Sequence, residues 1–139
     1  MIFFGDGPYY LLPPTNLDGN SIISYTPLIK KPKSPVHFIG LNSISIDGNP
    51  IQIPTKPAKL STVIPYTTLR TDIYKSFIKI FSKASMGLRL PRTKTIAPFG
   101  LCFKARVLEF TRVGFRVPQI DLELGSGRNW TVFRANSMQ

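Results

Sequence analysis

The stretch KLSTVIPYTTLRTDIY, residues 59–74, joins a run typical of a β-strand to the start of a helix. β-branched residues dominate its first part, and Pro65 requires a central strand to end or bulge there, because proline cannot donate to a strand ladder. A Thr-rich strand that closes on Leu69 and Tyr74 can carry an active site. Yet the segment from Lys59 to Arg70 contains no Asp, Glu, His or Cys, so the strand offers no catalytic side chain.

A helix is predicted directly after this strand, from about Thr71, with Thr71 or Asp72 as its N-cap. Four apolar residues at spacing i, i+3, i+4 and i+7 predict its buried face: Tyr74, Phe77, Ile78 and Phe81. Three lysines four residues apart line the opposite side: Lys75, Lys79 and Lys83. Their mutual repulsion could indicate an anionic partner, but a solvated helix face is the simpler interpretation.

The rest of the chain is predicted to be mainly β. The segment SISIDGNPIQI, residues 43–53, predicts a hairpin whose turn is Asp47-Gly48-Asn49-Pro50. Further strands are predicted over 21–29 (ending near Pro27), 36–42 (with a bulge at Gly40), 117–124 and 128–139, and a basic loop over 85–98. His37 lies in one of these strands and is interpreted as a half-exposed strand residue.

The composition limits the possible partners. The 139 residues fit one domain with a real core, and 18 basic against 7 acidic residues give a net charge of +11, which predicts attraction to something anionic. The basic residues are dispersed, however, and the aromatic-basic motif of an RNA-binding sheet is missing from the sequence. We therefore predict no specific nucleic-acid partner, and a basic solvated surface is the simpler interpretation.

The sequence also argues against several kinds of site. A single Cys102 and a single His37 exclude an internal disulfide, a cysteine-based zinc site and a catalytic triad, so neither a metal nor a cofactor is predicted. Asp121 and Glu123 share one strand face, as solvent-facing acids on an alternating strand often do. Asn129 begins a glycosylation sequon, Asn-Trp-Thr.

We expect no membrane span, because no apolar run approaches the roughly 20 residues that cross a bilayer. The start, MIFFGDGPYY, lacks the basic first region of a signal peptide, so none is expected in this chain.

Several segments together resemble the C-terminal lobe of plant aspartic-protease-like proteins. The resemblance is greatest to the xylanase-inhibitor-like branch, with basic 7S globulin and the extracellular dermal glycoproteins. The matching segments, in family order, are FFGDGPYYLLPP (3–14), SYTPLIKKPKSPVHFIGLNSISIDGNP (24–50), STVIPYTTLRTDIYKSF (61–77), APFGLCF (97–103), TRVGFRVPQIDLEL (111–124) and NWTVFRANSM (129–138). Of these, FIGLNSISIDG is shared with active plant aspartic proteases.

This resemblance explains the strand that lacks a catalytic side chain. In active relatives the strand carries Asp, then Ser or Thr, then Gly, before a Thr-rich run and a helix headed by Tyr. Alignment backward from Tyr74 and Leu69 puts Ser61, Thr62 and Val63 in those three places. Aspartic proteases need two carboxylates that share a proton around a water, and a serine hydroxyl cannot replace one. The resemblance therefore implies that Ser61 marks a lost catalytic position.

The resemblance implies one lobe of a pepsin-like double-β fold, with orthogonally packed antiparallel sheets and a short helix. Residues 1–139 are expected to form part of that lobe, with the N-terminal lobe and the last strands absent. The implied function is that of an extracellular or cell-wall protein without catalysis, which inhibits microbial glycoside hydrolases such as xylanase or endoglucanase, or serves as a seed or wall globulin. The alternatives are an aspartic endopeptidase lobe and a basic polyanion-binding module, for which an acidic polysaccharide is a possible ligand.

The resemblance also suggests contact residues. Family inhibitors insert protruding loops into glycosidase clefts, which hold paired carboxylates that suit a guanidinium. In the loop RLPRTK, residues 89–94, the candidates are Arg92 and then Arg89, although a solvated loop explains them equally well. The cysteine that pairs with Cys102 in relatives lies in strands that follow, so we expect a free, mostly buried thiol. Two departures are the short segment over 53–59 and Arg134, where relatives have Gly.

Overall fold

The structure, a computed structural model, describes residues 18–21, 23, 25–54, 57–61, 63–112, 114–133 and 137. Within these residues the fold is mainly β with one α-helix, as the sequence predicts. The helical elements are η1 (Gly19–Ser21), α1 (Thr71–Gly87) and η2 (Ala105–Val107). The strands are β1 (Leu28–Lys30), β2 (His37–Ile39), β3 (Leu41–Ile46), β4 (Asn49–Gln52), β5 (Ala58–Lys59), β6 (Phe110–Thr111), β7 (Gly114–Phe115), β8 (Ile120–Leu124) and β9 (Asn129–Val132).

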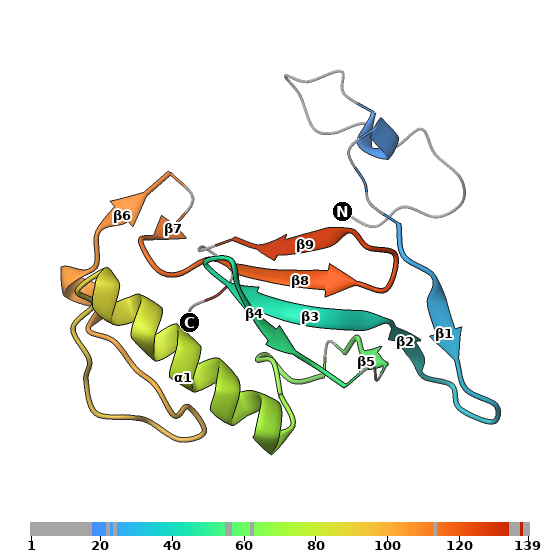
Figure 1. The fold of residues 1–139 in the computed structure, drawn as a ribbon, viewed down its shortest axis with the longest axis horizontal. Coiled ribbons are helices and arrows are strands. Elements are labelled where there is room, and N and C mark those ends of the chain that lie inside the picture. The colour runs from blue at the N-terminus through green and yellow to red at the C-terminus, as the bar shows by residue number, and fades with distance from the viewer. Residues whose placement is uncertain are drawn as a thin grey trace.

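The larger sheet has four antiparallel strands in the order β4-β3-β8-β9 (Figure 1). The predicted hairpin forms its β3–β4 half, with Ile44 opposite Ile51. Its turn is tighter than the predicted four residues, because Asp47 and Gly48 both have positive φ (46° and 76°) and Asn49 already pairs with Ile46. An Asp-Gly pair of this kind forms a turn whose twist matches the flanking strands.

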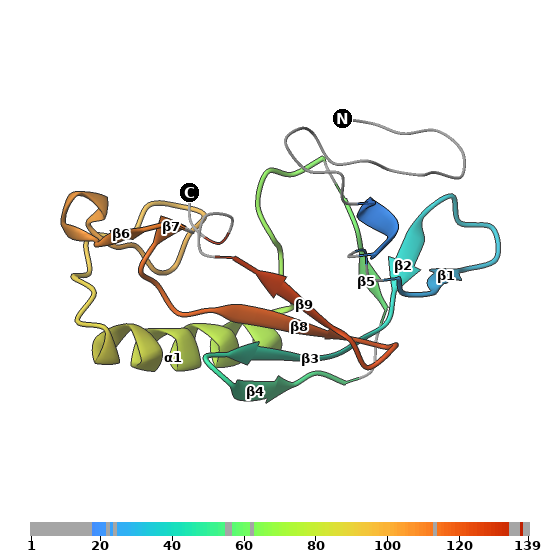
Figure 2. The ribbon, with the colours of Figure 1, turned by 90° about the horizontal axis from the view of Figure 1, so that it is seen from above.

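Helix α1 lies beside the β3–β4 end of this sheet in both views (Figures 1 and 2). The core joins Ile44, Ile46 and Ile51 of the hairpin to Phe81 of the helix. The helix residues that pack on this core are rotated from the predicted set: Ile73, Phe77, Ile80 and Ala84. Phe77 and Phe81 were predicted correctly, whereas Tyr74 and Ile78 lie at the margins of the packed stripe.

Helix α1 begins at Thr71 as predicted, but its cap and its C-terminal end differ from the prediction. Arg70 stands at the N-cap position and makes no side-chain capping hydrogen bond, so the predicted cap by Thr71 or Asp72 is wrong. The Asp72 carboxylate binds the Arg70 guanidinium instead. At the other end the helix runs to Gly87, three residues into the predicted basic loop, because Ser85 is buried and its hydroxyl donates to the Phe81 carbonyl (2.7 Å). None of the helices in the described part of the chain is long and apolar enough to cross a bilayer.

The smaller sheet has three antiparallel strands in the order β1-β2-β5, and the chain passes from it to the larger sheet at Gly40. The predicted bulge at Gly40 is thus a change of sheet, between β2 and β3. A Cβ on Gly40 would meet the Gly125 Cα at 3.4 Å, and the Gly125 N–H donates to the Gly40 carbonyl (2.9 Å), so the backbones approach closely there. The strand predicted to end near Pro27 begins after it instead, at Leu28.

Candidate functional site

The segment aligned with a catalytic motif is open to solvent. Strand β5 ends at Lys59, so the predicted strand does not extend through Ser61. Ser61 is exposed and its hydroxyl accepts the Val63 N–H (3.4 Å), a local bond that competes with strand pairing. Val63 is 86% exposed, and Thr62 lies outside the described residues. By its sequence, Ser61-Thr62-Val63, this segment offers hydroxyl groups and no carboxylate.

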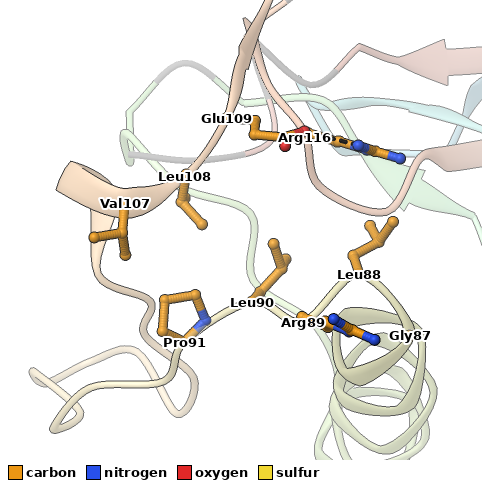
Figure 3. A pocket seen from close by; sticks show the side chains of 9 residues that line it. All are labelled: Gly87, Leu88, Arg89, Leu90, Pro91, Val107, Leu108, Glu109 and Arg116. Carbon is orange, nitrogen blue, oxygen red and sulfur yellow. Dashed lines mark hydrogen bonds and ion pairs between the residues drawn. The ribbon is translucent and has the colours of Figure 1, made fainter.

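A pocket of about 380 Å³ lies elsewhere, between the end of α1 and the segment that leads into β6 and β7 (Figure 3). It is lined by Gly87, Leu88, Arg89, Leu90, Pro91, Val107, Leu108, Glu109 and Arg116. The sequence prediction did not find it, because two segments about twenty residues apart in the chain form its two sides.

The charged side chains that line this pocket differ in whether they have an ion-pair partner. Arg116 donates to the Glu109 carboxylate (2.7 Å), so both charges are already engaged (Figure 3). Arg89 follows the helix end in a left-handed conformation with φ of 53°, an uncommon one for a residue other than glycine, and its N–H donates to the Met86 carbonyl (3.0 Å). Among the described lining residues, Arg89 brings the guanidinium that has no ion-pair partner. An anionic group beside an apolar one would suit this pocket.

Most of the predicted contact loop forms an antiparallel ribbon, in which residues 91–93 are paired with residues 102–104. Arg92 forms a β-bridge with Phe103, the Thr93 N–H donates to the Cys102 carbonyl (3.0 Å), and the Lys104 N–H donates to the Pro91 carbonyl (2.9 Å). Arg92 is exposed on this ribbon. The residues beyond the last of these bonds, 94–101, form the tip of the ribbon. Ile96 is 69% exposed there, whereas Phe99 packs against Tyr66 and Leu101 packs on the core. The predicted basic loop over 85–98 includes the first part of this tip, whereas the predicted contact residues lie before it.

The structure also places the predicted free cysteine and the predicted glycosylation sequon. Cys102 is a free, half-buried thiol on the inner strand of the ribbon, more exposed than expected. Asn129 is exposed at the first residue of β9, opposite Glu123, so a glycan there would extend into solvent.

The two acidic residues of β8 accept hydrogen bonds from side chains of the neighbouring strands. Alternation puts Asp121 and Glu123 on the sheet face opposite Leu122, which packs on the core. Glu123 accepts the Ser43 hydroxyl (2.6 Å) and Asp121 accepts the Thr131 hydroxyl (2.5 Å), each from a neighbouring strand. They are therefore half-buried structural acceptors on this sheet, whereas the sequence interpretation treated them as solvent-facing acids. Within the described residues, His, Cys, Asp and Glu side chains do not gather in threes where they could hold a metal ion.

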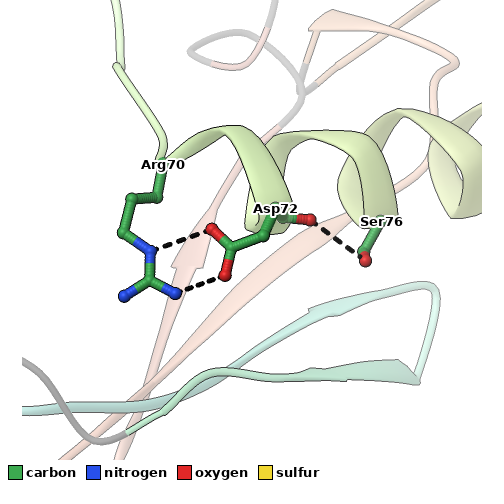
Figure 4. A network of polar contacts seen from close by, with 3 residues as sticks. All are labelled: Arg70, Asp72 and Ser76. Atoms are coloured by element: carbon green, nitrogen blue, oxygen red, sulfur yellow. Dashed lines mark hydrogen bonds and ion pairs between the residues drawn. The ribbon is translucent and has the colours of Figure 1, made fainter.

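A network of polar contacts joins Arg70, Asp72 and Ser76 at the start of α1 (Figure 4). Both guanidinium nitrogens Nε and Nη2 of Arg70 donate to the Asp72 carboxylate, the first at 2.8 Å, and the Ser76 hydroxyl donates to the Asp72 carbonyl (3.3 Å). The hydrogen bonds from Arg70 hold the pKa of the Asp72 carboxyl well below its usual range. The same pair raises the pKa of Arg70. Asp72 thus remains ionised, with its charge balanced by that of Arg70. It lies at the helix N-terminus, where a negative charge is favourable.

Comparison with known proteins gives a consistent family. Residues 37–139 match the family described as xylanase inhibitor C-terminal. The chain is 41% identical to a rice (Oryza sativa subsp. japonica) protein named chitinase CLP, over 97% of this chain and 33% of that protein. It is 38% identical to a probable aspartic proteinase of Nicotiana benthamiana, over 99% of this chain and 36% of that protein. The chain thus spans about a third of the length of these curated relatives.

Among solved structures, a crystal structure titled edgp superposes with a TM-score of 0.85 at 35% sequence identity. The match covers 98% of this chain and 38% of that one. This likeness confirms the predicted fold class, a lobe of the pepsin-like plant proteins that is mainly β with one helix.

Proposed function

The chain belongs to the family of xylanase inhibitor C-terminal domains, and from that premise we propose that it is a non-catalytic, aspartic-protease-like lobe that binds and inhibits microbial cell-wall glycoside hydrolases. Residues 1–139 are, in this proposal, part of one lobe of a larger double-β protein. The location is extracellular, in the cell wall, as for a protein that meets secreted microbial enzymes.

The observation that carries the proposal is the chemistry around Ser61. The described residues flanking it, 57–60 and 63–70, contain no acid, and the Ser61 hydroxyl is exposed and bonded to its own chain. An acid protease needs a carboxylate at this place to share a proton with a second one. Serine supplies neither the base that activates the water nor the acid that protonates the substrate carbonyl. Loss of catalysis leaves binding as the function of the lobe.

The binding surface we assign is the ribbon of residues 91–104 together with the neighbouring pocket. Arg92 is exposed and positioned by backbone bonds on both sides, which lowers the entropy that binding must overcome. Arg89 presents a second guanidinium at the pocket. Glycosidase clefts hold two carboxylates, and guanidinium groups bind carboxylates in a bidentate manner. The tip residue Ile96 adds exposed apolar surface farther along the ribbon.

The test measures inhibition of fungal and bacterial xylanases and endoglucanases by the chain, with and without Arg89→Ala/Arg92→Ala. We expect dose-dependent inhibition of at least one enzyme and a loss of about tenfold or more in affinity for the double variant, since an anchoring charged contact is worth about 2 kcal/mol or more. Arg106→Ala/Arg112→Ala removes the same charge from exposed positions outside the ribbon and should change little. Equal losses in both variants, or inhibition of none of the enzymes, would contradict the proposal.

One relative is named a probable aspartic proteinase, so the second candidate function is that of an aspartic endopeptidase lobe. The segment FIGLNSISIDG, residues 38–48, resembles active enzymes, but it forms the end of β2 and then β3, the first strand of the core hairpin. Pepstatin-sensitive cleavage of an unfolded protein by this chain would favour that function over ours.

A further inference from the structure

Among the described residues, the acidic side chains have partners within the chain more often than the basic ones do. Five of its described carboxylates accept hydrogen bonds from other residues of the chain: Asp47 from the Gln119 N–H (2.8 Å), Asp72 from Arg70, Glu109 from Arg116 (2.7 Å), Asp121 from Thr131 (2.5 Å) and Glu123 from Ser43 (2.6 Å). Two ion pairs join described residues, and they use Arg70 and Arg116. Among the described residues, the other lysines and arginines form no ion pair with a carboxylate.

Three of these free charges form a straight row on α1, which we call the lysine row: Lys75, Lys79 and Lys83. All three are exposed, and their four-residue spacing puts them about 6 Å apart along the helix axis. They lie on the side opposite the stripe of Phe77 and Phe81, which packs on the core. Like charges at this spacing destabilise an isolated helix by a few tenths of a kcal/mol per pair.

The one acid of the helix does not relieve this repulsion. Asp72 lies one turn before Lys75, at a spacing where an acid and a lysine can pair. Its carboxylate is instead held by both nitrogens of the Arg70 fork, as Figure 4 shows. The lysine row thus keeps its full positive charge toward solvent.

We propose that the lysine row binds an acidic polysaccharide, a sugar chain that carries carboxylates at regular intervals. An ammonium group pairs as a point charge with a single carboxylate, and it does not demand the bidentate geometry of arginine. A row of three such charges on a rigid helix meets an extended chain of separate carboxylates without rearrangement. This function goes beyond hydrolase inhibition and uses a different surface from the ribbon.

Two other anionic partners fit the row less well. Single-stranded nucleic acid needs aromatic side chains on which bases stack, but Phe77 and Phe81 of α1 face the core. A membrane surface needs the apolar face of an amphipathic helix free to enter the lipid, and that face of α1 is already packed against β3 and β4. Carboxylated sugar chains require neither.

The test is the affinity of the full 139-residue chain for polygalacturonate at low salt, by isothermal titration calorimetry. We expect binding that weakens as salt is added and that is absent for the fully methyl-esterified polymer. Lys75→Gln/Lys79→Gln/Lys83→Gln should weaken it at least tenfold, while circular dichroism shows the helix retained. The matched control, Lys30→Gln/Lys31→Gln/Lys33→Gln, removes three exposed charges near the β1–β2 turn and should cost no more than about a third of that loss.

Equal losses in the two triple variants would show attraction by net charge alone and would overturn the assignment to the lysine row. No binding of polygalacturonate, or tighter binding of single-stranded DNA or of anionic lipid vesicles, would overturn the choice of ligand. These outcomes leave hydrolase inhibition untouched, because Arg89 and Arg92 are unchanged in both variants.

Discussion

The two largest sheets of this molecule both contain apolar strand residues, but other elements cover them to different extents. In the larger sheet, Ile44, Ile46 and Ile51 are buried beneath α1. In the smaller one, Ile39 of β2 is buried, but all three residues of β1 are exposed, and the chain that leaves β5 exposes Leu60 and Val63. The comparison teaches that an apolar strand is buried only where another element lies on it.

The comparison also bears on function. The position aligned with a catalytic carboxylate, Ser61, lies in the less covered region, next to exposed side chains. Catalytic groups must be held to a fraction of an ångström by packed neighbours. The region that would need such support does not have it here, whereas the packed region supports α1 and, through it, the ribbon and the lysine row.

The largest expected effect contrasts the two regions directly. Ile46 is 0% exposed in the core of the larger sheet, so Ile46→Ala should lower the free energy of unfolding by about 2–5 kcal/mol. Val63→Ala removes methyl groups that are already in solvent and should change it by less than about 0.5 kcal/mol. Urea unfolding followed by circular dichroism measures both. Similar losses for the two variants would mean that the smaller region is packed as tightly as the core.

An intermediate effect tests how the ribbon meets α1. A Cβ on Gly100 would lie 2.2 Å from the Tyr74 hydroxyl oxygen, so Gly100→Ala should destabilise the protein by about 1–3 kcal/mol. In a Tyr74→Phe background that atom is gone and the nearest ring carbon is at 3.3 Å, so the cost should fall. Gly87→Ala is the control: nothing lies within 4 Å of the added Cβ, and the change should be neutral or slightly stabilising. An unchanged cost in the phenylalanine background would place the ribbon elsewhere.

The smallest expected effect concerns the start of α1. The folded pKa of Asp72 is lowered by Arg70, so the pair stabilises the fold above the ordinary carboxyl pKa of about 3.9, and this contribution is lost as pH falls below it. Asp72→Asn should therefore be less stable than the unaltered chain near neutral pH, with a difference that shrinks in acid. Arg70→Gln should follow the same profile, measured by thermal unfolding at several pH values. A difference that is constant with pH would exclude the ion pair as its cause.

Part of this structure follows from local sequence rules. The Asp-Gly turn and the alternating isoleucines fix the β3–β4 hairpin, and the alternation of β8 puts Leu122 toward the core and Asp121 away from it. The existence and start of α1 follow from its apolar spacing. The resemblance of several segments, taken together, indicated the lobe that the structural comparison confirms.

The rest depends on contacts between distant residues. The helix cap was mispredicted because Arg70 competes for the Asp72 carboxylate, and the helix end because buried Ser85 bonds to the helix itself. The pocket joins residues 87–91 to residues 107–116, which no local pattern connects. The position of Ser61 outside a strand follows from the early end of β5, and neither Pro65 nor the β-branched residues alone reveal it.

The central claim is that this chain has lost acid-protease chemistry at Ser61. The most direct measurement is cleavage of an unfolded protein substrate between about pH 3 and 6, where carboxylate pairs titrate, with and without pepstatin. We expect no pepstatin-sensitive cleavage by the chain, and none by Ser61→Asp, because Val63 still stands where the active motif has Gly and a single carboxylate has no partner. Reproducible pepstatin-sensitive cleavage by the unaltered chain would contradict both the alignment of Ser61 and the assignment of a non-catalytic, inhibitor-like function.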